Sequence, residues 1–297
     1  MSQVASPRPP DADLDPQAIT SRSGSNFLAG FVALDAERRE AMTVVYAFCR
    51  VVDDAVDDAP DVDTGRAWLT FWGDQLEAAA ERRANVPVGE ALQASMQRFG
   101  IPVQALRELV AGCAMDLEPD GPKDEQELEL YCYRVAAAVG LACLPVLGAD
   151  SEGGRRYAVE LGHALQLTNV LRDLRSDAEV GRVYVPRTWL DEFGIDREVL
   201  LGNADAAHYA PGGGVARLCE RLARRAHQRF DAARQELRRL PRAERRGLVA
   251  ARIMGAVYGD LLRRLDRRAG DIVVPRVRVP KWRKLWLALA VWAGLRA

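Results

Sequence analysis

Apolar residues are spaced for helices along nearly the whole of this chain. Between residues 36 and 58 they recur three or four positions apart, as in Ala41, Val44, Val45, Phe48, Val51 and Val52. Runs of alternating β-branched residues are almost absent, and glycine and proline interrupt the pattern at short intervals. The spacing predicts helices at residues 36–58, 65–83, 88–98, 103–116, 124–147, 152–178, 215–239 and 242–268. The only strand-like piece is RVYVP at 182–186.

Composition supports a single globular domain and excludes several classes of protein. The chain has 297 residues, of which 48% are hydrophobic and 28% charged. Its formal net charge of -1 argues against a general nucleic-acid-binding protein, which normally carries a basic excess. The five cysteines contain no C-x-x-C pair, so we interpret them as reduced core thiols of a cytoplasmic protein. The sequence therefore predicts an all-α, single-domain helical bundle.

The two ends of the chain differ from its centre. Residues 1–20 are polar and contain prolines, without the apolar stretch of a signal peptide, so we expect them to be disordered. Residues 21–275 would form the helical domain. The tail, residues 276–297, holds six Lys or Arg and no acid among tryptophans and leucines. It is equally compatible with an interfacial helix resting on anionic membrane and with a helix packed on the bundle.

An acidic face marks the end of the first long predicted helix. At about 100° per residue, Tyr46, Arg50, Asp53 and Asp57 share one face, and Asp54 lies beside them. Aspartates four positions apart repel each other unless a cation neutralises them. They also lie near a helix C-terminus, where the helix dipole disfavours negative charge. Two interpretations stay open here: a solvated acidic helix end and a metal site.

A second polar face lies on the helix predicted at 152–178. Gln166, Asn169, Asp173 and Asp177 follow one another at helical spacing, with leucines and valines on the other sides. The alternatives are a buried hydrogen-bonded network and the wall of a polar cavity. Two D-x-x-x-D helices in one bundle favour opposed walls of one site, with oxygen ligands of the kind that Mg²⁺ prefers.

Magnesium held by facing carboxylates suits a diphosphate leaving group. Three arginines lie on or near the acidic faces, namely Arg50, Arg172 and Arg182. Each is equally explained as a ligand of diphosphate and as an ion-pair partner that holds an aspartate in place.

Several segments together resemble the squalene/phytoene synthase family. They are SGSNFLAGF at 23–31, EAMTVVYAFCRVVDDAVDD at 40–58, YCYRVAAAVG at 131–140, and ALQLTNVLRDLRSDAEVGRVYVP at 164–186. The tail RVRVPKWRKLWLAL is also similar to the usual tail of that family. The resemblance implies an all-α class I isoprenoid synthase fold with a central cavity. It also implies an enzyme that joins two prenyl diphosphates head to head.

The resemblance also implies which residues form the site. Asp53, Asp54 and Asp57 would hold Mg²⁺ at one diphosphate, and Asp173 and Asp177 at the other, with two or three ions in all. The resemblance and the two polar faces together give five catalytic candidates: Arg50, Tyr131, Arg172, Tyr184 and Tyr258. The substrate-binding candidates are Ser25, Phe27, Tyr46, Gln166, Asn169 and Arg182. Asn26 and Ser176 depart from the family pattern, but neither is a primary metal ligand.

The exact reaction is left open among three alternatives. We favour condensation of two farnesyl diphosphates to presqualene diphosphate, which extends to squalene only if NADPH supports a reductive second step. No G-x-G-x-x-G fingerprint occurs in the sequence. The second alternative is a phytoene synthase that uses geranylgeranyl diphosphate, and the third is a non-catalytic assembly or lipid-binding factor. We expect a cytoplasmic protein with peripheral membrane contact through its tail, and the sequence leaves the oligomeric state open.

Overall fold

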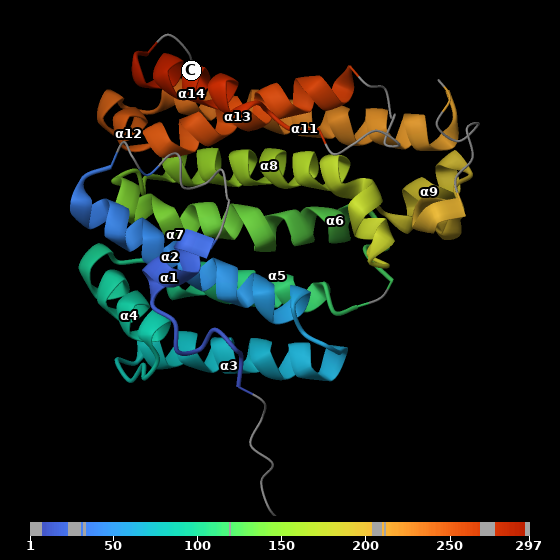
Figure 1. The fold of residues 1–297 in the computed structure, drawn as a ribbon. Helices are drawn as coiled ribbons and strands as arrows, with labels where there is room; N and C mark the ends of the chain where they lie inside the picture. Colours follow the sequence, from blue (N-terminus) through green and yellow to red (C-terminus); the bar gives the residue numbers. More distant parts are fainter. Residues whose placement is uncertain are drawn as a thin grey trace, which may run out of the picture.

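The computed structural model describes residues 8–22, 31, 34–118, 120–203, 210, 212–267 and 277–294. No strand occurs in these ranges, and most of the described residues lie in helices (Figure 1). The first half contains α1 (Pro16–Arg22), α2 (Ala36–Asp57), α3 (Val62–Ala80), α4 (Pro87–Phe99), α5 (Val103–Met115), α6 (Glu125–Cys132), η2 (Tyr133–Ala137) and α7 (Ala138–Leu147). The second half contains α8 (Glu152–Glu179), α9 (Arg187–Phe193), η3 (Val199–Asn203), α11 (Gly214–Arg239), α12 (Arg242–Gly247), α13 (Val249–Asp266) and α14 (Lys281–Trp292). The all-α prediction is confirmed.

Local signals in the sequence explain where the two helices with acidic faces begin. Asp35 precedes α2, and its carboxylate accepts a hydrogen bond from the backbone N–H of Arg38. Ser151 precedes α8, and its hydroxyl accepts one from the N–H of Gly154. Both side chains satisfy a backbone donor that a helix start leaves without an intrahelical partner.

The helices lie in stacked layers that place α2 and α8 on either side of a central helix (Figure 1). That central helix is continuous from α6 through η2 to α7, and η2 is a π-helical turn within it. It packs against α5 on one side and α8 on the other, while α11 covers the far side of α8. π-helical turns often occur at functional sites, because they bend a helix locally.

Two glycines allow the neighbouring helices to approach η2 closely. A Cβ atom on Gly162 of α8 would lie 2.4 Å from the Cα of Ala137, and one on Gly112 of α5 would lie 2.7 Å from the Cβ of Arg134. Neither position has room for a side chain. Both helices are therefore held at a distance that only glycine permits.

One described helix, Glu125–Leu147, is long and apolar enough to cross a membrane by length and composition, with a mean hydropathy of 1.7. Half of its most apolar window is buried inside the bundle. Because the core helix of a globular protein passes the same test, this finding is weak evidence for a membrane span.

The structure adds to the sequence predictions at three places. Residues 8–22 include α1, and Ile19 joins the hydrophobic core, so the described order begins before residue 21, where we predicted that the domain starts. Residues 1–7 lie outside the described part of the chain. The segment 182–186 is an irregular connection between α8 and α9, because it has no partner strand with which to pair. Helix α9 carries no long apolar period and was not predicted.

Candidate active site

The acidic face of α2 is organised by Arg50. Its Nε donates to Oδ2 of Asp54 over 2.9 Å, and its Nη1 lies 3.4 Å from a carboxylate oxygen of Asp53. Asp57 lies one turn beyond Asp53, on the same face and exposed. Arg50 therefore acts in this structure as the ion-pair partner of two aspartates.

One arginine does not balance the charge on this face. Desolvation and the carboxylate of Asp57 raise the pKa of Asp53 to about 7, against the lowering effect of Arg50. Desolvation also raises the pKa of Asp54 to about 6, against the lowering effect of Arg50. Raised carboxylate pKa values mean that the negative charge is under-compensated, which is the condition that a bound cation relieves.

The polar face of α8 presents amides and one buried ion pair. Nδ2 of Asn169 donates to Oε1 of Gln166 over 3.2 Å. Asp173 is buried, and the Nε of Arg172 donates to its Oδ1 over 2.8 Å. Tyr258 on α13 acts on the same guanidinium, since its hydroxyl helps to raise the pKa of Arg172. The face therefore lies close to a third helix.

A cavity of about 990 Å³ lies between these two faces. Its polar walls include Tyr46, Arg50, Asp53, Gln166, Asn169, Arg172 and Tyr258. Its apolar walls are formed by Val45, Leu109, Val135, Ala136, Val139, Leu165, Met254, Val257 and Leu261. This combination of a large apolar interior and one polar end suits a ligand with a long hydrocarbon chain and a charged head.

The rim of the cavity is basic. Arg278, Lys281 and Lys284 line it, although none of them was among our site candidates. Partial burial lowers the pKa of Lys284, and the charges of Arg278 and Lys281 lower it further. Positive charge therefore gathers opposite the acidic faces. The basic composition of the tail was the only sequence signal for these residues.

A bridge joins the far ends of the two acidic helices. Arg182, which follows α8, pairs with the carboxylate of Asp57, and its Nη2 lies 3.4 Å from the carbonyl oxygen of Val56. Desolvation lowers the pKa of Arg182, but the hydrogen bond to Asp57 and the charges of Tyr184, Asp57 and Asp116 together outweigh it, so the net pKa is raised. The segment that follows α8 therefore contacts the acidic face of α2.

Two of the candidate tyrosines form a stacked pair beside this bridge. The rings of Tyr131 and Tyr184 lie 5.0 Å apart, inclined at 19°. Both hydroxyls interact with the carboxyl group of Asp116, at the end of α5, and this interaction lowers the pKa of Asp116 against the larger effect of desolvation. Asp116 is a residue that sequence reasoning missed, because a lone aspartate at a helix end carries no pattern.

Some of the predicted site residues line the cavity, and others are not among its lining residues. Seven of the candidates line the cavity, as given above. The others that the structure describes lie beside the cavity or at its acidic end: Asp54, Asp57, Tyr131, Asp173, Asp177, Arg182 and Tyr184. Ser25 and Phe27 lie outside the described residues.

The donor set fits a divalent metal that is completed by a ligand from the substrate. In the described ranges, no three carboxylate, histidine or cysteine side chains converge on one point. Oδ1 of Asn169 is buried in the cavity wall without a hydrogen-bond partner. An orphaned amide oxygen near facing carboxylates is a hard oxygen donor, and Mg²⁺ typically takes only one or two carboxylates together with phosphate oxygens and water.

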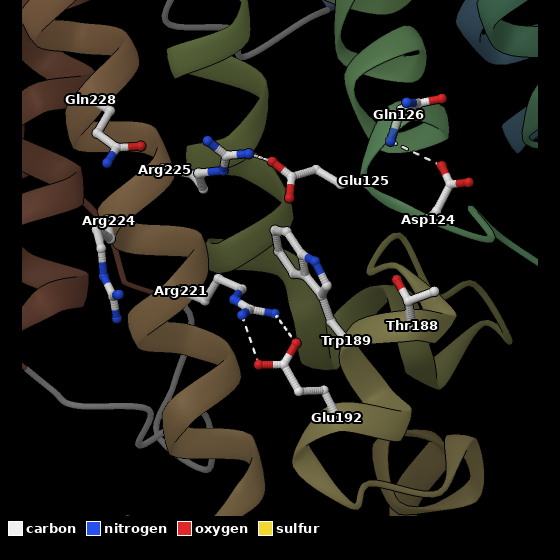
Figure 2. Close-up of a pocket in the computed structure, with 10 residues that line it drawn as sticks. All are labelled: Asp124, Glu125, Gln126, Thr188, Trp189, Glu192, Arg221, Arg224, Arg225 and Gln228. Carbon is white, nitrogen blue, oxygen red and sulfur yellow. Dashed lines mark hydrogen bonds and ion pairs between the residues drawn. The ribbon is translucent and has the colours of Figure 1, made fainter.

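A second hollow, of about 590 Å³, lies between α6, α9 and α11 and contains none of the predicted residues (Figure 2). Two of its three arginines, Arg221 and Arg225, make structural contacts. Arg221 pairs with Glu192 at 2.7 Å and covers the ring of Trp189 at 5.0 Å, and Arg225 pairs with Glu125. These contacts fasten α9 and α6 to α11.

Comparison with known proteins gives a consistent result. Residues 20–283 match the sequence model of a family described as squalene/phytoene synthase. The chain is 35% identical to a presqualene diphosphate synthase of Zymomonas mobilis, over 93% of this chain and 92% of that protein. It is 37% identical to a presqualene diphosphate synthase of Rhodopseudomonas palustris, over 86% and 88%. It is 33% identical to a phytoene synthase of Rhodobacter capsulatus, over 93% and 80%.

Solved structures share the fold. A dehydrosqualene synthase crystallised with a ligand superposes with a TM-score of 0.79 and 26% identity, over 94% of this chain and 95% of its own. A squalene synthase from Alicyclobacillus acidocaldarius superposes with a TM-score of 0.72 and 26% identity, over 86% and 92%.

Proposed function

This chain belongs to the squalene/phytoene synthase family, and we propose that it condenses two farnesyl diphosphates to presqualene diphosphate with release of diphosphate. As a member of that family it is a prenyltransferase, and it joins two prenyl diphosphates head to head. The observation that carries the proposal is the cavity between α2 and α8, which has one polar end and long apolar walls. The presqualene diphosphate synthases among its relatives support the choice of substrate.

A divalent metal, which we take to be Mg²⁺, would be held on both faces. Asp53, Asp54 and Asp57 would hold it at one diphosphate, and Asp173 and Asp177 at the other. When bound, the metal neutralises charge on the leaving diphosphate as the carbon–oxygen bond breaks. Two or three ions would satisfy the five carboxylates.

The protein's own residues bind and orient the diphosphates at the polar end. Arg50 and Arg172 each have further N–H donors beyond those bound to aspartate, and the bonds to Asp173 fix the direction of the Arg172 guanidinium. Gln166 and Asn169 add amide groups between them, and Arg182 reaches the same end through Asp57. Tyr131 and Tyr184 would lie near the ionising centre.

The apolar walls protect the carbocation that forms when the first allylic diphosphate ionises. The C2=C3 double bond of the second substrate then attacks C1 of this cation, and loss of a proton closes the cyclopropane ring. Water must be excluded throughout, since it would capture the cation. The ring of Tyr46, at the edge of the cavity, offers a cation–π contact. The released diphosphate is the proton acceptor in this scheme.

Incubation of the purified protein with Mg²⁺ and each prenyl diphosphate tests the substrate. A C30 cyclopropyl diphosphate from farnesyl diphosphate, detected by mass spectrometry, is the expected product. Squalene formed only with NADPH would extend the reaction. A C40 product from geranylgeranyl diphosphate would transfer the assignment to phytoene synthase, the second candidate, which a 33% identical relative supports.

Substitution of the aspartates separates the enzyme from a non-catalytic factor. Asp53→Asn and Asp173→Asn should each lower kcat/KM by about a hundredfold, because each removes a metal ligand. Asp63→Asn is the matched control, since Asp63 lies in the same acidic run but is exposed on α3. Unchanged turnover in both site variants would contradict the proposed metal ligands.

The proposed location is the cytoplasm, at the inner face of a membrane. The substrates carry long apolar chains and the product is a lipid, so exchange with a bilayer is the simplest source and destination for them.

A further inference from the structure

Helix α14 has two apolar faces, and only one of them is used by the bundle. Leu287, Ala290 and Val291 are buried against the rest of the protein. The opposite face carries Trp282 (68% exposed), Leu285 (63%), Trp286 (46%), Leu289 (55%) and Trp292 (73%). Large apolar side chains that gather at helical spacing on one exposed surface mark an interaction site. We call these five residues the α14 face.

The other exposed large apolar side chains do not form such a surface. Among the described residues they are Val62, Leu130 and Val180, which lie on α3, on α6 and just after α8. Single exposed apolar residues are normal in globular proteins. The α14 face therefore differs in kind from the remainder of the described surface.

The charged residues of the tail that carries the α14 face are all basic. Residues 276–297 contain six Lys or Arg and no acidic residue. Arg278 and Lys281 are exposed at the start of the helix. Tryptophans beside lysines and arginines are the combination found at the interface between bilayer and water, where indoles occupy the headgroup level and cations meet anionic lipids.

The cavity wall and the α14 face belong to one segment. Val277, Arg278, Val279, Pro280, Lys281 and Lys284 line the cavity, and the exposed apolar residues begin at Trp282. Figure 1 shows α14 as an outermost element, lying along α13. Any partner that contacts the α14 face therefore lies beside the rim of the cavity.

We propose that α14 docks on an anionic lipid bilayer, with the α14 face inserted among the acyl chains and Arg278 and Lys281 at the headgroups. This orientation brings the cavity rim to the lipid surface, so that a prenyl chain passes between bilayer and cavity without crossing water. The role of this docking in substrate transfer rests on the proposed function, but the contact with the bilayer depends only on α14.

Vesicle flotation of the full chain tests the docking without any substrate. Vesicles of phosphatidylcholine alone are compared with vesicles that contain a quarter phosphatidylglycerol. The anionic vesicles should bind the protein at least about fivefold better, and 0.5 M salt should remove that difference. The double variant Leu285→Gln, Leu289→Gln should reduce binding by about tenfold or more, because it replaces the centre of the inserted face.

The double variant Val62→Gln, Leu130→Gln is the matched control, since it makes the same chemical change at exposed positions outside α14. It should bind vesicles like the natural sequence. Equal binding by the α14 variant and the natural chain would overturn the proposal, as would self-association through α14 with no vesicle binding. Turnover of detergent-dispersed substrate, measured in parallel, should be unchanged in the α14 variant. If vesicles bind but no substrate turns over, the proposed reaction fails while the docking stands.

Discussion

At the scale of single residues, Asp116 connects the tyrosine pair to the acidic end of the cavity. Desolvation raises its pKa to about 6, while hydrogen bonds from Tyr184 and Tyr131 and the charge of Arg182 lower it. Its Oδ1 has no hydrogen-bond partner. Both hydroxyls therefore interact with one carboxyl group, while the two rings stay stacked. Asp116 is thus a positioning residue for Tyr131 and Tyr184.

Substituting Asp116 by Ala should lower kcat about tenfold and leave KM almost unchanged, because the tyrosine hydroxyls lose the carboxyl group with which both interact but the diphosphate ligands stay in place. A double-mutant cycle with Tyr131→Phe checks this in steady-state kinetics. The two effects should be strongly non-additive, since they remove the same interaction. Tyr133→Phe, a tyrosine on the other side of the helix in an outer groove, is the control. Additive effects on kcat would contradict the positioning role.

At the scale of elements, the central helix depends on the two glycines that flank its π-helical turn. Gly162→Ala should lower the free energy of unfolding by about 3 kcal/mol, because its Cβ would overlap backbone atoms of Ala137 that have nowhere to move. Gly73→Ala is the control: its nearest neighbour would be 3.9 Å away, so the same change on α3 should stabilise by about 0.5–1 kcal/mol. Urea denaturation measures both. Equal effects at the two positions would show that close approach is not what requires Gly162.

The contact between α13 and α14 depends on one buried carboxylate. Asp260 accepts from Arg264 at 2.7 Å and from Arg283 of α14 at 3.2 Å. Burial raises the pKa of Asp260, but these hydrogen bonds outweigh it and hold the pKa below its usual value. A depressed folded-state pKa stabilises the fold above the unfolded value of about 4, and that contribution is lost as the pH falls through the folded value.

Asp260→Asn should therefore cost about 2 kcal/mol of unfolding free energy at pH 6, and the difference from the natural sequence should shrink as the pH is lowered below 4. Asp63→Asn, which alters an exposed aspartate on α3, should show no such dependence. Denaturant unfolding followed by tryptophan fluorescence gives both values. A difference that stayed constant down to pH 3 would contradict the role of the carboxylate charge.

At the scale of the whole molecule, the sequence predicts the faces of single helices but not the contacts between residues that are far apart in the chain. The faces that carry Asp53 and Asn169 follow from helical spacing alone, because periodicity depends only on neighbouring residues. The pairing of Arg182 with Asp57 joins residues 125 positions apart, and no pattern in either segment indicates it. The same applies to Asp116 below the tyrosines and to Lys284 at the cavity rim, whose positions are set by tertiary packing. Helices were therefore predictable, whereas the side-chain contacts that assemble the site from distant segments were not.

The two halves of the proposed site come from helices that are far apart in the chain, so a ligand that bridges them should stabilise the whole fold. Mg²⁺ with inorganic diphosphate at about a hundred times the apparent Kd should add about 2.7 kcal/mol to the free energy of unfolding, or about 5 °C to Tm. Differential scanning fluorimetry measures the shift. Neither component alone should reproduce it, because the carboxylates need the metal and the metal needs phosphate oxygens to complete its ligand shell. The double variant Asp53→Asn, Asp173→Asn should lose the shift, whereas Asp63→Asn should keep it. A shift of the same size with diphosphate alone would mean that the arginines hold the ligand without metal.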